Sequence, residues 1–99
     1  MVIVLRTSYP TEKAPEMGKR FLEVPALPDY ITRRGPYVLG VREAGIQSIT
    51  VYEIDRSTKL AEACEEVAKQ AVHFIGVAGY TYSIDVCFEV EEALKMIGL

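Results

Sequence analysis

The sequence has little of the chemistry that metal sites and redox motifs require. Its 99 residues include no Trp, one His and two Cys. Two cysteines cannot supply the four ligands that an iron–sulfur cluster normally needs. Cys64 and Cys87 also do not form the CxxC pair of zinc ribbons and thioredoxin-like motifs. The lone His73 argues against a histidine-based metal site within one subunit, so we expect no metal and no cofactor.

The sequence also lacks the signals for membranes and nucleic acids. No apolar run approaches the roughly 18 residues needed to span a bilayer, and residues 1–6 do not resemble a secretory signal. The chain has 11 basic and 14 acidic residues, a formal net charge of −3 that argues against general nucleic-acid binding. No Walker, GxGxxG, HExxH or Ser-His-Asp arrangement is present. We expect a cytoplasmic protein with reduced thiols, no membrane contact and no nucleic-acid partner.

What remains is an ordinary globular composition, with 49% hydrophobic and 25% charged residues. The length predicts one domain over residues 1–99. Runs of β-branched and apolar residues predict strands over 2–9, 37–43 and 46–55, and a clean alternation predicts one over 80–90. Helical spacing of apolar residues predicts helices over 11–24, 57–75 and 91–99. The proline-containing segment 25–36 is expected to be a stiff connection with a short helical turn, and Ala44-Gly45 to form a tight hairpin turn.

The order β-α-β-β-α-β, followed by a short helix, predicts an α+β fold of the ferredoxin-like type. Such a domain is a four-stranded antiparallel sheet with both main helices on one face. The first strand is nevertheless apolar on both sides, with Val2 and Val4 on one and Ile3 and Leu5 on the other. The helices cannot cover the second face. We therefore expect a homodimer that packs its sheets together through the face opposite the helices.

This layout resembles the dimeric α+β barrel superfamily. The segments that carry the resemblance are TEKAPEMGKRFLEV, GPYVLGVREAG, GYTYSIDV and FEVEEALKMIGL, which are similar to a small branch of it. The superfamily includes stress-responsive proteins and antibiotic-biosynthesis-type monooxygenases. The resemblance covers nearly the whole chain and concerns its architecture. It implies two ferredoxin-like subunits with their sheets paired as a barrel.

The barrel-facing surface is the predicted location of a ligand site. Arg6 and Asp85 lie on strands expected to be antiparallel neighbours, so they are predicted to approach each other. The other residues predicted on this surface are Arg42, Ser48, Thr50, Tyr52, Ser83 and Cys87. A guanidinium among hydroxyl groups suits a small polar or anionic ligand. The alternative is that Arg6 and Asp85 form a structural ion pair that fixes the register of the dimer.

Two further residues invite a chemical interpretation. Cys87 could be a nucleophile if Arg6 or Arg42 lowered its pKa, and the alternative is a small buried hydrophobe. His73 falls on the polar arc of its helix, where a solvated surface histidine is the expectation and a general base the alternative. Neither residue belongs to a recognisable catalytic motif.

The sequence therefore leaves three functional classes open. The leading hypothesis is a non-catalytic homodimer that binds a small ligand or serves in an assembly. The second is a cofactor-independent enzyme, monooxygenase- or isomerase-like, that holds a small organic substrate. The third is a small-molecule sensor module, because amino-acid-sensing domains share the β-α-β-β-α-β order.

Overall fold

A computed structural model describes the backbone of residues 1–99 and every side chain except that of Ser57. The strands are β1 (Val2–Tyr9), β2 (Ile31–Val41), β3 (Gly45–Ile54) and β4 (Thr81–Cys87). The helices are α1 (Ala14–Phe21), α2 (Leu60–Val72) and α3 (Val90–Met96), and the short 3-10 helices η1 (Thr11–Lys13) and η2 (Ser57–Lys59) precede α1 and α2. The β-α-β-β-α-β order with a terminal helix is confirmed.

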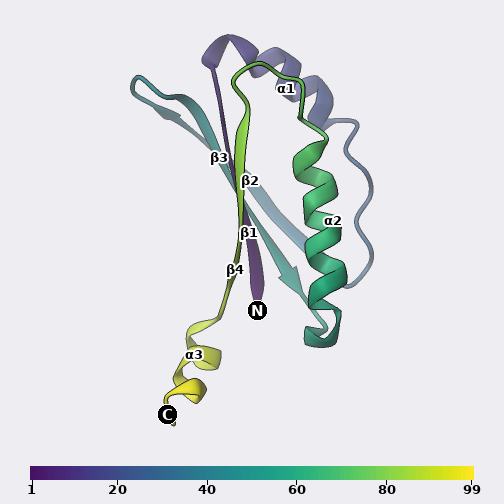
Figure 1. Cartoon of the computed structure of the whole chain (residues 1–99), viewed down its shortest axis with the longest axis vertical. Helices are drawn as coiled ribbons and strands as arrows, with labels where there is room; N and C mark the ends of the chain where they lie inside the picture. Colours follow the sequence, from purple (N-terminus) through teal and green to yellow (C-terminus); the bar gives the residue numbers. More distant parts are fainter.

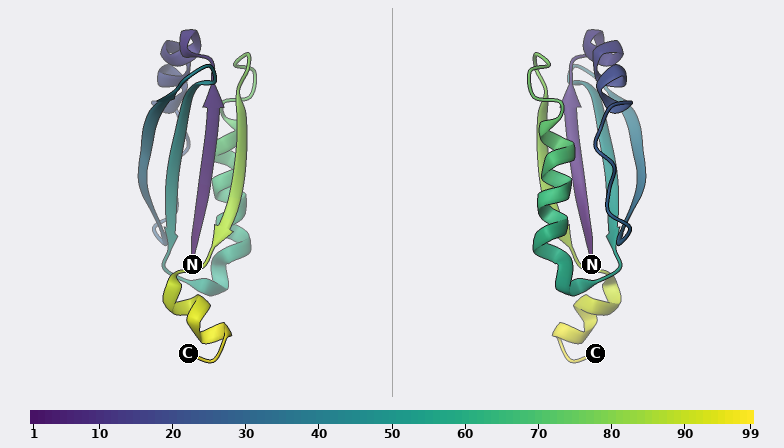
Figure 2. Two further views of the ribbon diagram at one scale, coloured as in Figure 1. Left: turned by 90° about the vertical axis from the view of Figure 1, so that its left-hand side faces the viewer. Right: turned by 90° about the vertical axis from the view of Figure 1, so that its right-hand side faces the viewer.

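The four strands form one antiparallel sheet in the order β2-β3-β1-β4. Both α1 and α2 cover the same face of this sheet, and the other face is open (Figures 1 and 2). The resulting molecule is thin, with extents of 48 × 29 × 17 Å. This is an α+β fold with an open antiparallel sheet, consistent with the ferredoxin-like class.

The core lies between the sheet and the helices. The apolar stripe of α2 places Ala63, Val67 and Ala71 against Ile3 and Leu5 of β1, as helical spacing predicts. A second cluster joins Tyr9, Met17, Phe74 and Val77 beneath α1. The two clusters lie on one face of the sheet, and the space between α1 and the sheet is not completely filled by them.

The prediction for residues 25–36 was wrong, because β2 begins at Ile31. Residues Ile31–Arg34 pair with the end of β3, where a loop with a helical turn was expected. The register shifts between Arg34 and Tyr37. A proline in an edge strand is tolerated at such an irregularity, since its missing N–H need not face a neighbour. The strand signal was hidden by Gly35 and Pro36.

Several predicted boundaries also move. The helix expected over 11–24 ends at Phe21 and is followed by turns up to Val24, whose helical geometry Pro25 disfavours. The strand expected over 80–90 stops at Cys87, where the chain turns into α3. The hairpin turn contains three residues rather than two, since Val41 pairs with Gly45. The left-handed Glu43 (φ 70°) and Gly45 (φ 88°) make this longer turn.

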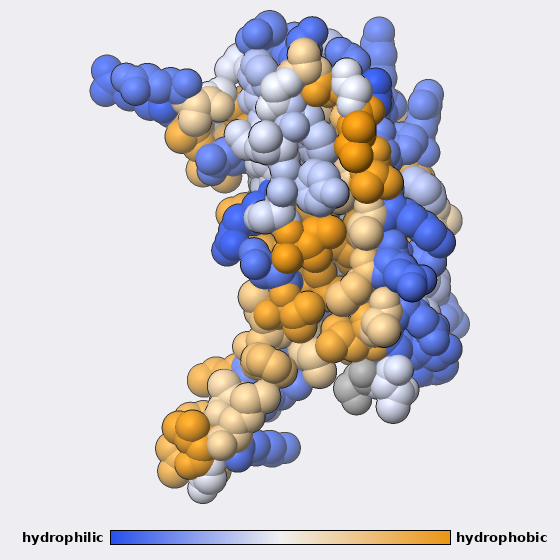
Figure 3. Space-filling model, in the orientation of Figure 1, coloured by the Kyte–Doolittle hydropathy of each residue, from blue (hydrophilic) through white to orange (hydrophobic). Residues whose placement is uncertain are grey.

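The helix α3 extends beyond the end of the sheet. Its first turn carries a capping box. The Glu89 side chain accepts the backbone N–H of Glu92, and the Glu92 side chain accepts the backbone N–H of Glu89. The ammonium group of Met1 donates to Glu92 and ties α3 to the start of β1. In Figure 1 the sheet is seen along its edge, and α3 and the β2–β3 turn both project to the side of the open face. Figure 3, in the same orientation, shows the molecule hollowed between them.

Candidate ligand site

The strand register decides which side chains share a face. In antiparallel pairs, directly opposed residues point to the same side of the sheet. Leu5, a core residue, is opposed by Thr50, whereas Val4 is opposed by Val51 and Asp85. The odd residues of β1 and β4 therefore point in opposite directions. The even residues of β3 point towards the helices.

This register divides the predicted ligand site between two faces. Arg6, Ser83, Asp85 and Cys87 lie on the open face, as expected. The prediction was wrong for Ser48, Thr50 and Tyr52, which are buried on the helix face. Apolar residues occur on both sides of β3, so its alternation alone does not identify the buried side.

The predicted contact between Arg6 and Asp85 is present. Nη1 of Arg6 lies 3.2 Å from Oδ2 of Asp85, and the two side chains are 58% and 52% exposed in the single chain. A second pair on the same face joins Arg34 to Glu53, with Nε donating to Oε1 over 2.6 Å. That hydrogen bond raises the pKa of Arg34. Both cations on the open face are thus already bound to carboxylates.

The remaining candidates do not form a catalytic group. Cys87 is half-buried opposite Val2 at one end of the sheet. Arg42 lies in the exposed β2–β3 turn at the other end, so the prediction that it joins the site was wrong. His73 also differs from expectation, since its Nε2 is buried without a hydrogen-bond partner and its ring packs edge-on against Phe74. No hydrogen bond or ion pair joins any of these three side chains to the Arg6–Asp85 pair among the described residues.

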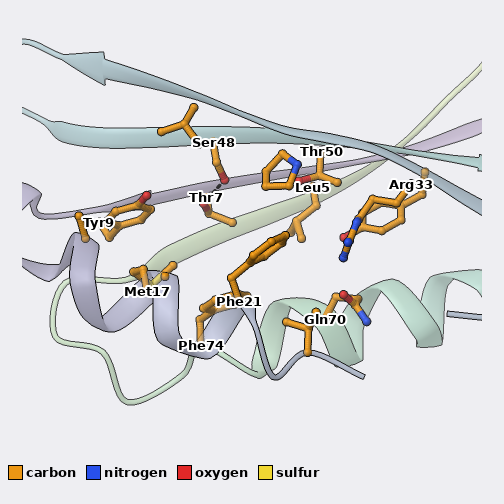
Figure 4. Close-up of a pocket in the computed structure, with 16 residues that line it drawn as sticks. Leu5, Thr7, Tyr9, Met17, Phe21, Arg33, Ser48, Thr50, Gln70 and Phe74 are labelled. Atoms are coloured by element: carbon orange, nitrogen blue, oxygen red, sulfur yellow. Dashed lines mark hydrogen bonds between the residues drawn. The ribbon is translucent and has the colours of Figure 1, made fainter. Parts of the chain in front are cut away.

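A cavity of about 320 Å³ lies on the helix face, between α1 and the β1, β2 and β3 strands. Figure 4 shows the side chains that surround it. Those lining residues are Leu5, Thr7, Tyr9, Ala14, Met17, Gly18, Phe21, Val24, Arg33, Pro36, Val38, Ser48, Thr50, Tyr52, Gln70 and Phe74. Ligand pockets typically have this character, a mainly apolar wall with a few polar groups.

The polar and apolar groups of the cavity are separated along its length. Tyr9 and Met17 lie at one end, whereas Arg33 and Gln70 lie at the other (Figure 4). Between them, the hydroxyl groups of Thr7 and Ser48 share a hydrogen bond and satisfy each other. The cavity therefore has an apolar end and a polar end.

The titratable groups of the lining are two phenols and one guanidinium. Burial raises the pKa of Tyr52 to about 12, against a smaller opposing effect of the Arg33 charge. Burial likewise raises the pKa of Tyr9. Both phenols are therefore neutral at neutral pH. The charge facing the cavity is that of Arg33, whose guanidinium lies 5.1 Å from the centroid of the Phe21 ring.

The sequence interpretation missed Arg33 and Gln70 for different reasons. Arg33 lay in a segment predicted to be a loop, so no face could be assigned to it. Gln70 fell on the polar arc of its helix, yet it is only 3% exposed and its Nε2 donates to the carbonyl of Pro25 over 2.6 Å. The segment that contains Pro25 passes beside α2 and covers Gln70, which explains why this side chain is buried.

Comparisons with known proteins add no family to this description. No protein-family model matches the chain, and a search of curated proteins finds no match. Within the described residues, no group of three or more acidic, His or Cys side chains is arranged to hold a metal ion. None of the described helices is both long and apolar enough to cross a membrane.

Proposed function

We propose that this protein is a non-catalytic homodimer whose subunits each bind a small, largely apolar molecule in the cavity beneath α1. The cavity itself is the observation that carries this proposal. Its volume of about 320 Å³ falls within the range of small-molecule sites, which begins at roughly 300 Å³. The neutral phenols of Tyr9 and Tyr52 can donate hydrogen bonds to a bound molecule at neutral pH.

The helix-face cavity suits a ligand better than the open face does. On the open face, Arg6 and Arg34 already bind Asp85 and Glu53. A ligand there would have to break a charge-assisted hydrogen bond before forming its own. The guanidinium that lines the cavity, that of Arg33, forms no such ion pair among the described residues.

The test is to fill the cavity. Gly18 lines it, and a Cβ at this position would meet no atom within 4 Å. We expect Gly18→Phe to fold, because phenylalanine has a higher helix propensity than glycine. It should weaken binding of a neutral apolar fluorescent probe, N-phenyl-1-naphthylamine, by about tenfold or more. Lys19→Phe, one residue further along the exposed side of α1, is the matched control and should bind like the wild type.

Saturable probe binding that survives in Gly18→Phe would place the probe elsewhere and contradict the proposal. Absence of saturable binding to the wild type would also contradict it. Arg6→Ala separates the two faces further. It should leave probe binding unchanged, because Arg6 lies on the opposite side of the sheet from the cavity.

Exposed apolar side chains on and beside the open face are the basis for proposing a dimer. Tyr37 is 60% exposed there, next to Leu39, and both pair with β3 residues of the same face. Exposed apolar side chains directly after α3 include Ile97 at 72% and Leu99 at 83%. Such apolar surface marks an interaction site. A second copy, related by a two-fold axis, would cover the hollowed face in the manner of the dimeric α+β barrels that the sequence resembles.

Charge supports a second copy as the occupant of this face. A face-to-face dimer would bury the Arg6–Asp85 and Arg34–Glu53 pairs, and each is neutralised within its own subunit. Burying a paired charge costs less than burying an isolated one. The two ion pairs would then fix how the two subunits align. This is the structural role that the sequence suggests as the alternative for Arg6 and Asp85.

Sedimentation velocity tests the dimer. At micromolar concentration, the wild type should sediment at twice the 11.0 kDa of one chain. Leu39→Asp should shift it to the monomer, because two carboxylates would enter the apolar interface. Leu22→Asp is the control, since Leu22 is 84% exposed on α1's side of the molecule. A wild-type monomer, or an unchanged Leu39→Asp dimer, would contradict this part of the proposal.

A further inference from the structure

The polar end of the cavity opens to solvent at Arg33, an exposed cation that has no ion-pair partner in the part of the chain that the structure describes. Arg33 and Arg34 are neighbours in β2, so their side chains leave opposite faces of the sheet. Arg34 binds Glu53 on the open face, whereas Arg33 lines the cavity on the helix face. No ion pair among the described side chains includes Arg33. Its guanidinium packs against the Phe21 ring, which holds the charge beside the cavity.

Two uncharged donors lie at the same end. Tyr52 is directly opposed to Arg33 across the β2–β3 pair and is only 2% exposed. None of the side-chain hydrogen bonds among the described residues involves its hydroxyl. The Gln70 amide uses one N–H on Pro25, and an amide nitrogen has two. A guanidinium, a phenol and an amide N–H together form a set of donors with no acceptor assigned to them.

The other end of the cavity requires a different chemistry from its ligand. Tyr9, Met17 and Phe74 belong to one buried apolar cluster, and each of them also lines the cavity. At this end a strongly polar molecule would lose most of its hydration and gain only the Tyr9 hydroxyl as a hydrogen-bond partner. A hydrocarbon or aromatic body would instead bury apolar surface there.

We propose that the ligand is an amphipathic monocarboxylate, whose carboxylate binds Arg33 and whose apolar body lies between α1 and the sheet. This inference rests on the proposed function, because it assigns a chemical class to the ligand of the same cavity. The guanidinium matches a carboxylate with two parallel hydrogen bonds. The Tyr52 hydroxyl and the free N–H of Gln70 are positioned at the same end to donate to it.

Octanoate and 1-octanol test the assignment, because they share an apolar chain length and differ in the head group. Binding of each to the full-length protein is measured by isothermal titration calorimetry or by displacement of N-phenyl-1-naphthylamine. We expect the wild type to bind octanoate about tenfold more tightly than 1-octanol. Arg33→Gln should abolish this preference and leave 1-octanol binding unchanged. Arg34→Gln, which alters the neighbouring guanidinium on the other face, should retain it.

The outcomes separate this inference from the proposed function. If 1-octanol binds as tightly as octanoate to the wild type, the cavity is an apolar site and the carboxylate assignment is wrong. If the preference for octanoate survives in Arg33→Gln, Arg33 is not the head-group ligand and the inference fails. If neither compound binds, the proposed function fails and this inference fails with it. Gly18→Phe should weaken binding of both compounds, which ties any preference to this cavity.

Discussion

At the scale of single residues, arginines have three different roles in this small protein. Arg6 and Arg34 form exposed ion pairs, and pairs of this kind contribute only about 0–1 kcal/mol of stability. Arg33 faces the cavity. Arg20 instead connects two helices, because its Nη1 donates to the carbonyl of His73 over 3.2 Å and to that of Ile75 over 2.8 Å. These carbonyls follow the end of α2, where the helix dipole favours a cation.

We expect Arg20→Met to destabilise the protein by about 1–2 kcal/mol. The change keeps the aliphatic stem and removes two hydrogen bonds from a charged donor, and solvent at this partly exposed site reduces their sum below the roughly 1.5–3 kcal/mol that one such bond contributes when buried. Urea unfolding at one fixed protein concentration measures the effect. Lys19→Met, at the adjacent exposed position, is the control and should change the free energy of unfolding little. Equal values for the two variants would contradict a connecting role for Arg20.

At the scale of elements, the β2–β3 hairpin sets the register of half the sheet. Its turn ends at Gly45, whose φ of 88° is a left-handed value. A Cβ at this position would lie 2.6 Å from the carbonyl oxygen of Tyr9. The turn is therefore packed directly against the end of β1. The contact lies beside the Tyr9–Ile46 pair, which belongs to the same register that places Thr50 and Tyr52 on the helix face.

Two alanine substitutions in the hairpin should differ clearly in their effect on stability. Gly45→Ala is expected to lower the free energy of unfolding by ~2 kcal/mol or more, since left-handed geometry alone costs an L-residue about 1–2 kcal/mol. Gly40→Ala, in β2, meets no atom within 4 Å and should be neutral or slightly stabilising. Thermal unfolding by circular dichroism compares them. A Gly45→Ala melting temperature equal to that of Gly40→Ala would show that the turn does not constrain the sheet.

At the scale of the whole molecule, one layer of helices and one sheet make a core that is only partly enclosed. Tyr52 lies in this core, and burial raises its pKa to about 12 from an unfolded value of 10.0. Burial also raises the pKa of Tyr80, whose hydroxyl donates to the carbonyl of Ala71. In both cases folding favours the neutral phenol. The free energy of unfolding should therefore depend on pH in the alkaline range, where these phenols titrate.

The sign of this coupling predicts an alkaline loss of stability. Below pH 10 the phenols are protonated in both states, and their contribution to stability is complete. Between about pH 10 and 12 the unfolded state releases the Tyr52 proton while the native state retains it, so the free energy of unfolding falls. Tyr52→Phe should make this fall shallower and leave stability at pH 7 nearly unchanged. Urea unfolding at a series of pH values measures the slope, and identical slopes for both proteins would contradict the assignment.

Local patterns predicted the type of most elements because each pattern involves residues close in sequence. The β-branched run of Val2–Tyr9 predicted β1 with its correct bounds, and the apolar stripe of α2 predicted the surface that packs on Ile3 and Leu5. The Arg6–Asp85 contact also followed from the expected strand order. Ile31–Arg34 was missed because Gly35 and Pro36 interrupt the strand pattern there. Two apolar sides on β1 further indicated a sheet face that the helices leave uncovered.

The sequence alone thus determined the order of the elements, the α+β class and the chemistry that the chain lacks. Only the tertiary structure decided which side of β3 is buried, and with it that Thr50 and Tyr52 line a cavity rather than the open face. The physical reason is the period of two in a strand: pairing shifted by one residue exchanges its faces, and register depends on distant contacts such as that between Gly45 and Tyr9. The same dependence places Arg33 beside Tyr52 and Gln70, three residues that no local pattern connects.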